Sequence, residues 1–230
     1  MAFTSKNKFN AYTMDEFKSE YARQSKIWEE SKTRQFLVEQ LERFTPGQIA
    51  GVKKIFGFAL GDVSMLKASY EGDVQRPFAQ HATLKTIAKF LEEHNGGREV
   101  PCYSQDPALT DGYGAEFIKS IGITPLDDPN GFLEVDESTF VVSIAPNIPV
   151  RQVIADITKP RAMLWDSVGE INGNEWTWSE NEDGRIKWEC PYTTDSTSPR
   201  VAALVEDYDH LDFVDHDKWF CATALYARKN

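Results

Sequence analysis

The sequence predicts an α/β protein with a doubly wound, mainly parallel sheet, and two observations lead to this prediction. Short apolar runs rich in β-branched residues alternate with longer amphipathic runs, and Gly, Asp or Pro separates them. This alternation is typical of strand–helix units whose right-handed crossovers cover both faces of a parallel sheet. The 230 residues, 41% of them hydrophobic, are enough for one large domain with appendages.

Residues 1–50 are predicted to form an N-terminal helical arm. Residues 13–44 contain no Gly or Pro, and aromatic residues and leucines recur there at helical spacing. Pro46 and Gly47 mark the stop. The pattern predicts one long or two shorter amphipathic helices packed on the body, with a mobile lid over a pocket as the alternative.

The next segment, residues 51–170, is predicted to form the core of the fold. The expected strands are residues 55–60, 99–105, 123–126, 139–145 and 161–168, and the expected helices are residues 77–94, 110–121 and 150–157. A buried strand, a glycine-containing loop and a helix open the segment, which is the first half of a βαβ unit. The whole order predicts a Rossmann-like sheet.

Residues 171–230 are predicted to be an acidic β extension that completes the same domain. Residues 174–190 alternate about a turn at 180–184, which is typical of an antiparallel hairpin, and residues 218–228 are expected to form a final strand. The tryptophans of the hairpin are expected in the core, with a surface that binds a partner as the alternative.

The net charge of −11 is unevenly distributed. The segment from Asp166 to Asp217 has 14 acidic and three basic residues, whereas the rest of the chain has 22 of each sign. Such a balance argues against nonspecific binding to nucleic acid or to an anionic membrane. The acidity of the C-terminal region predicts solubility, with a basic protein partner as the alternative.

The cysteines and the N-terminus predict a reducing compartment. Cys102, Cys190 and Cys221 form no CxxC pair, so neither a disulfide framework nor a zinc site is expected. There is no signal peptide and no apolar run of about 18 residues, which predicts a cytoplasmic or nuclear protein. The spacing of His210 and His216 matches neither HExxH nor an EF-hand loop, so no metal site is expected there.

Candidate ligand-binding residues follow the carboxyl ends of the expected strands, where open α/β sheets bind ligands. They are Gly57, Ala59, Gly61 and Asp62 at the first strand, Asp106 after the second, Asp127 and Asp128 after the third, and Pro146 and Asn147 after the fourth. The glycines permit close approach of a ligand, and a carboxylate after the second strand grips ribose hydroxyls in nucleotide-binding proteins. These residues favour a nucleoside-bearing ligand, with tight turns alone as the structural alternative.

The sequence also indicates which type of ligand and which type of chemistry to expect. GFALG is not GxGxxG, and no helix is expected directly after it, so a ligand without a diphosphate, such as S-adenosylmethionine, fits better than a dinucleotide. The serines lack a GxSxG context, and no cysteine has a recognisable partner, so no catalytic residue is assigned.

Several segments resemble one family. KKIFGFALGDVS, RPFAQHATLKTIAKFL, PCYSQDPALTD and GITPLDDPNGFLEVDESTFVVSIAPN resemble the SRR-like domain, named for Sensitivity to Red Light Reduced, over residues 28–168. The final ALYARK is similar to the ends of fungal members. The resemblance places Gly57 and Gly61 in the first loop of the family, Gln80 in its helix and Asp106 in its Asp-Pro pair.

The chain departs from the family at two places. Members commonly have Gly-Leu-Gly where this chain has Ala59–Leu60–Gly61, and a His-Cys pair where it has Asn147–Ile148. If that pair binds a ligand or metal in relatives, this chain has lost it.

The resemblance implies a Rossmann-like, methyltransferase-like fold and a regulatory role inside the cell. Plant members are associated with light signalling and the circadian clock, a yeast member with microtubule function, and animal members with haem metabolism. Haem ranks behind a nucleoside-bearing ligand because no axial ligand can be named. Two alternatives remain open: a methyltransferase or other small-molecule enzyme, and a non-catalytic protein-interaction module.

Overall fold

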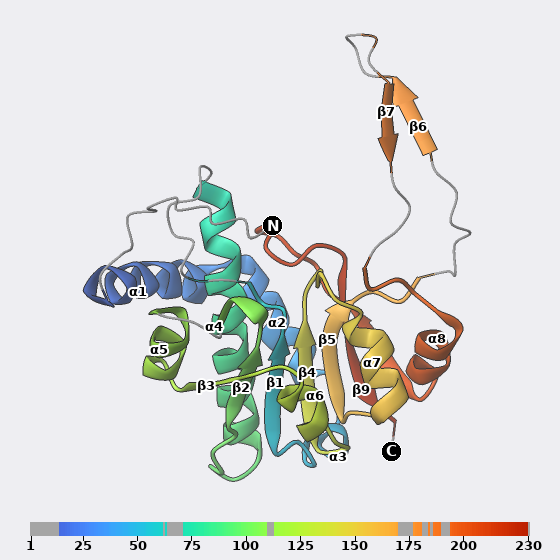
Figure 1. Cartoon of the computed structure of the whole chain (residues 1–230). Helices are drawn as coiled ribbons and strands as arrows, with labels where there is room; N and C mark the ends of the chain where they lie inside the picture. Colours follow the sequence, from blue (N-terminus) through green and yellow to red (C-terminus); the bar gives the residue numbers. More distant parts are fainter. Residues whose placement is uncertain are drawn as a thin grey trace.

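The computed structural model has a seven-stranded main sheet in the order β3-β2-β1-β4-β5-β9-β8 (Figure 1). It describes residues 14–61, 63, 71–109, 113–169, 177–180, 184, 186–189 and 194–229. The strands of the main sheet are β1 (Lys54–Phe58), β2 (Cys102–Gln105), β3 (Ile123–Leu126), β4 (Thr139–Ser143), β5 (Ala162–Asp166), β8 (Tyr208–Asp212) and β9 (Thr223–Arg228). The first five are parallel, and β9 is antiparallel to both of its neighbours. The predicted α/β class with a mainly parallel sheet is confirmed.

Helices cover both faces of this sheet (Figure 1). Residues that alternate along β4 belong to two separate cores, with Phe140 and Val142 in one and Val141 in the other. The first core includes side chains of α1 (Met14–Glu30), α2 (Lys32–Glu42), α4 (Glu71–His94) and α5 (Tyr113–Ser120). The second includes side chains of α6 (Asn130–Glu134), α7 (Val150–Ile157) and α8 (Pro199–Val205). The sheet is therefore doubly wound, as predicted.

From residue 14, where the described part begins, the N-terminal region forms two helices, α1 and α2, and both are packed on the body. They break at Ser31, whose hydroxyl accepts a hydrogen bond from the backbone N–H of Arg34 at 3.1 Å and so caps α2. Trp28, Leu37 and Leu41 are fully buried in the first core. A short α3 (Pro46–Ile49) then leads to β1. The helix predicted at 110–121 is present as α5, which η1 (Pro107–Leu109) precedes.

The C-terminal region contains two elements that were not predicted, β8 and α8, and its final strand is shorter than predicted. The DYDHLD segment of this acidic region forms β8, because Tyr208 is buried and pairs in register with Arg228 while the charged residues lie on an edge strand. The final strand begins at Thr223 rather than 218, since Lys218 and Cys221 have left-handed backbones, with φ of 64° and 57°. Residues 199–205 form α8, which Ser198 caps.

The predicted hairpin is present as β6 (Thr177–Glu180) and β7 (Ile186–Glu189), but it forms a separate two-stranded sheet (Figure 1). The predicted burial of its tryptophans concerns side chains outside the described part of the structure. No helix in the described part of the chain is long and apolar enough to cross a membrane.

Candidate functional site

The order of the strands reverses between β1 and β4. From β1 the chain continues through α4 to β2 on one side, whereas β4 continues through α7 to β5 on the other. In doubly wound sheets ligands bind at the carboxyl edge beside such a reversal. The loops after β1 and β4 are therefore the candidate site, and they contain Gly61 and Asn147 from the predicted set.

Both of these loops contain an alanine with a left-handed backbone. Ala59 directly follows β1 and has φ of 53°, and Ala145 lies two residues beyond β4 with φ of 44°. The left-handed region costs a residue with a Cβ atom about 1–2 kcal/mol. Strained backbones of this kind cluster at functional sites, where the surrounding structure holds them.

Carboxylates from the two flanking strands hold these loops. Asp106, which follows β2, accepts a hydrogen bond from the Gly61 N–H at 2.9 Å, and Asp166 at the end of β5 accepts one from the Ala145 N–H at 2.9 Å. Burial raises the pKa of Asp166, and the Ala145 N–H and the Arg151 guanidinium partly offset this effect. The edge thus has an acid on each side of the reversal.

Three predicted residues serve the packing of α4. Gly57 is buried, and a Cβ atom there would clash with the side chain of Leu60. Gly61 has φ of 85°, which favours glycine. The buried amide of Gln80 donates from Nε2 to the carbonyl oxygen of Trp219 at 3.0 Å and ties α4 to the C-terminal region. Asp62 lies outside the described residues.

Asp127 and Asp128 follow β3, two strands away from β1, so they lie away from the reversal of strand order. Asp128 accepts a hydrogen bond from Gln105 Nε2 at 2.9 Å, and Gln105 Oε1 accepts one from the Gly131 N–H at 2.6 Å. Gly131 lies in the first turn of α6, which begins at Asn130. This cluster anchors α6 to β2.

On the other side of the reversal, Pro146 is buried and Asn147 is exposed. The carbonyl oxygen of Pro146 accepts a hydrogen bond from Thr194 Oγ1 at 2.7 Å. The structure thus brings Ala59, Gly61 and Asp106 to one side of the candidate site and Pro146 with Asn147 to the other.

A buried ion pair that was not predicted from the sequence lies beside this edge. Arg151 and Asp195 are 4% and 2% exposed, and Arg151 Nε lies 3.2 Å from the Asp195 carboxylate. Asp195 also accepts hydrogen bonds from the backbone N–H of Arg151, while Arg151 Nη1 donates to the carbonyl oxygen of Asp166 at 3.0 Å. An arginine in the first turn of a helix opposes the helix dipole, which is the signal that a carboxylate partner was needed.

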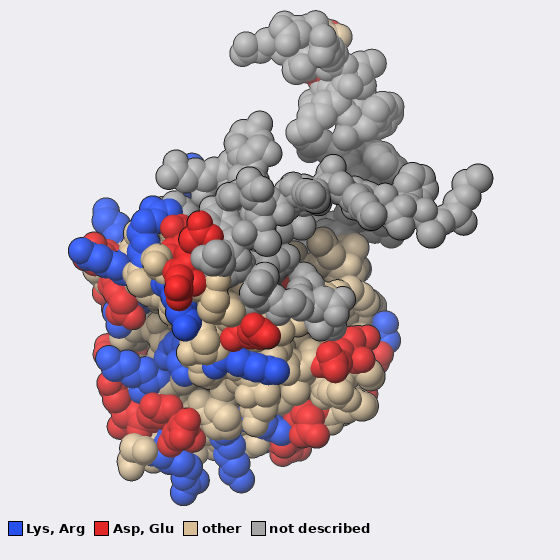
Figure 2. All heavy atoms as spheres, turned by 60° about the vertical axis from the view of Figure 1, so that its left-hand side comes forward, with Lys and Arg blue, Asp and Glu red and all other residues tan. Residues whose placement is uncertain are grey.

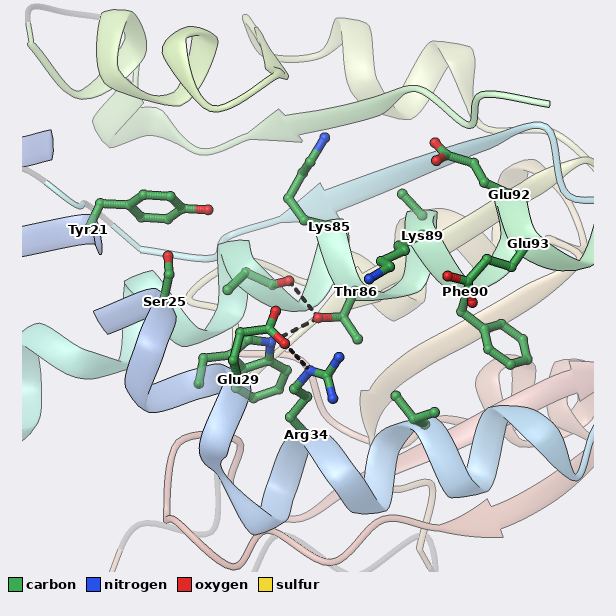
Figure 3. Close-up of a pocket in the computed structure, with 14 residues that line it drawn as sticks. Tyr21, Ser25, Glu29, Arg34, Lys85, Thr86, Lys89, Phe90, Glu92 and Glu93 are labelled. Carbon is green, nitrogen blue, oxygen red and sulfur yellow. Dashed lines mark hydrogen bonds and ion pairs between the residues drawn. The ribbon is translucent and has the colours of Figure 1, made fainter. Parts of the chain in front are cut away.

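A groove of about 470 Å³ lies elsewhere, between α4 and the two N-terminal helices (Figure 3). Its floor includes Trp28, whose Nε1 donates to Thr86 Oγ1 at 2.9 Å, and its rim includes the ion pair of Arg34 with Glu29 at 2.9 Å. The charged lining residues are Arg34, Lys85, Lys89, Glu29, Glu92 and Glu93. The charged residues of the lining therefore sum to zero formal charge.

Charged side chains of both signs are also intermixed on the surface. Figure 2 shows Lys and Arg side chains intermixed with Asp and Glu on the face that includes the left-hand side of Figure 1. The described residues contain no group of three His, Cys, Asp or Glu side chains that could hold a metal ion.

The strain at Ala145 leads to a stability prediction. Ala145→Gly is expected to raise the free energy of unfolding by about 0.5–1 kcal/mol, because relief of the left-handed strain exceeds the added flexibility of the unfolded chain. The control, Ala155→Gly within α7, is expected to lower it by about 1 kcal/mol. Urea unfolding measures both, and equal destabilisation of the two variants would contradict the strain at Ala145.

Comparison with known proteins assigns neither a family nor a function to this chain. No protein-family model, curated protein or solved structure matches this chain. The functional proposal below therefore depends on the geometry of the carboxyl edge and on the residues that resemble the SRR-like domain.

Proposed function

We propose that this chain is an SRR-like regulatory protein that binds a small nucleoside-bearing ligand at the carboxyl edge of β1 and β4. The observation behind the proposal is the contact between Asp106 and Gly61 beside the strand-order reversal. It puts the carboxylate that follows β2 against the loop that follows β1. Nucleotide-binding α/β proteins place their ribose-binding carboxylate in this position.

The charge at the edge favours S-adenosylmethionine over a nucleotide. Asp106 and Asp166 flank the candidate site, so a phosphate there would meet two carboxylates. The sulfonium of S-adenosylmethionine is positively charged and would be attracted. In addition, α4 begins only at Glu71, so its own N-terminus does not directly follow Gly61 as it would in a diphosphate-binding loop.

The topology also supports this ligand class. The antiparallel β9 is inserted between β5 and β8, after five parallel strands in the order 3-2-1-4-5. This is the strand order of methyltransferase-like sheets. The strand order supports the class of ligand rather than a particular reaction, because no described residue at the edge is assigned as a nucleophile or a general base.

The test is calorimetric titration of the full chain with S-adenosylmethionine, S-adenosylhomocysteine, adenosine and ATP. Binding of the first three and weaker binding of ATP are expected, whereas no heat from any of them would remove the proposal. Asp106→Asn keeps an acceptor for the Gly61 N–H but loses the charge, and it is expected to weaken binding of S-adenosylmethionine about tenfold.

The matched control is Asp156→Ala, an exposed carboxylate on α7 that pairs with Arg200. It is expected to leave the affinity unchanged. If Asp106→Asn binds as tightly as the unmodified chain, Asp106 only holds the loop, and its assignment to the ribose is wrong.

A further inference from the structure

Two buried polar groups on adjacent strands lack partners at the candidate site. Ser143 and Trp165 are 1% and 0% exposed, and they are register partners in β4 and β5. Among the described residues, neither the Ser143 hydroxyl nor the Trp165 Nε1 has a hydrogen-bond partner. Buried polar groups in native proteins are nearly always paired, so two adjacent exceptions require an explanation.

The two side chains point to the same face of the sheet. Residues two apart on a strand share a face, so Ser143 lies with Val141, and Trp165 lies with Met163, in the core beneath α7. Neighbouring strands are about 4.8 Å apart, so the two side chains start from neighbouring positions on this face.

The pair lies close to the edge at which the ligand is proposed to bind. Ser143 is the last residue of β4, and the exposed Ala145 is only two residues further. That separation is about 7 Å along an extended chain. Ser143 and Trp165 therefore lie directly behind the edge residues Ala145 and Asp166.

The chemistry of the two groups selects a neutral acceptor. The indole Nε1–H can only donate, and the serine hydroxyl can donate beside it. An anion bound there would need a buried cation, but Arg151 is already paired with Asp195 and donates to the carbonyl oxygens of 166 and 167. A carbonyl oxygen or an unprotonated ring nitrogen fits, and a phosphate or carboxylate does not.

We infer that Ser143 and Trp165 recognise the base of the ligand by donating hydrogen bonds to one neutral acceptor on its edge. This inference depends on the proposed function, because it deepens the same site. It assigns specificity to two residues outside the set predicted from the sequence. Asp106 and Asp166 then bind the ribose and the sulfonium, while these two neutral donors form hydrogen bonds with the base.

The binding test uses adenosine and its 1-deaza, 3-deaza and 7-deaza analogues, each of which lacks one ring-nitrogen acceptor. Ser143→Ala and Trp165→Phe are each expected to weaken adenosine binding about 5–20-fold. One of the three analogues is expected to bind the unmodified chain as weakly as adenosine binds the variants. The affinity of this analogue is expected to fall little further in either variant.

The stability test uses two matched controls within the chain. Ser104 on β2 is equally buried, but its hydroxyl lies 3.3 Å from His81 Nε2, and the Nε1 of Trp28 is bonded to Thr86. Ser104→Ala and Trp28→Phe are expected to lower the melting temperature by about 3–8 °C, because each loses a made hydrogen bond. Ser143→Ala is expected to leave it unchanged or raise it by about 1–4 °C, and Trp165→Phe is expected to lower it less than Trp28→Phe does, because it leaves a similar cavity but breaks no hydrogen bond.

The outcomes separate the two proposals. If the unmodified chain binds none of the adenosine-containing probes, the proposed function fails and this inference fails with it. If it binds adenosine and both variants bind equally well, only the inference fails. A third outcome is that Ser143→Ala lowers the melting temperature as much as Ser104→Ala does and leaves the affinity for adenosine unchanged. The two donors would then bind an internal water, and the inference would be overturned.

Discussion

An Asp195→Ala variant is expected to lose about 3–5 kcal/mol of its unfolding free energy. The substitution leaves the guanidinium of Arg151 buried without its carboxylate and leaves the backbone N–H of Arg151 in the first turn of α7 without its acceptor. A domain is typically stable by only about 5–15 kcal/mol, so the loss is a large share of the total. Urea unfolding followed by circular dichroism measures it.

Two further variants show whether the buried charge is the cause. Asp156→Ala breaks an exposed ion pair with Arg200 and is expected to cost about 1 kcal/mol or less. The double variant Arg151→Met with Asp195→Leu removes both buried charges and is expected to recover part of the lost stability. The explanation is wrong if Asp195→Ala costs no more than Asp156→Ala.

The sequence predicted the parallel part of the fold because its signals are local. The strand at 123–126 and the helix at 150–157 have the predicted bounds, since Gly or Pro punctuates an apolar run at each. β8 was missed because an edge strand needs few apolar residues when its partner buries one face. Its pairing with β9 is set by tertiary contacts, which no local pattern records.

Only the part of the candidate site that follows from the order of parallel strands could be predicted from the sequence. The carboxyl ends of β1 and β2 had to meet, since the strands are parallel, and the register pairs Phe58 with Gln105. Gly61 and Asp106 therefore fall together as predicted. The contact of Arg151 with Asp195 could not be foreseen, because it joins segments on either side of the hairpin.

The unpaired donors at Ser143 and Trp165 could not be foreseen either. A serine and a tryptophan in two apolar strands look like ordinary core residues. Their meaning appears only when the register places them side by side on the α7 face.

A Trp28→Ala variant is the second large effect, with an expected loss of about 3–5 kcal/mol of unfolding free energy. Trp28 is 2% exposed, and its ring lies 5.9 Å from that of Trp219 and 5.7 Å from that of Phe220. Its Nε1 also donates to Thr86 on α4. One side chain thus joins the N-terminal helices, α4 and the C-terminal region.

This variant also tests whether the N-terminal helices are a separate arm or part of the cooperative unit. If they are part of it, tryptophan fluorescence and circular dichroism report one transition that moves to lower urea as a whole. If they were a separate arm, the main transition would stay in place and only a small early change would appear. A single shifted transition is expected, because the carbonyl oxygen of Trp219 also accepts the hydrogen bond from Gln80, so loosening the tryptophan pair disturbs α4 near the candidate site.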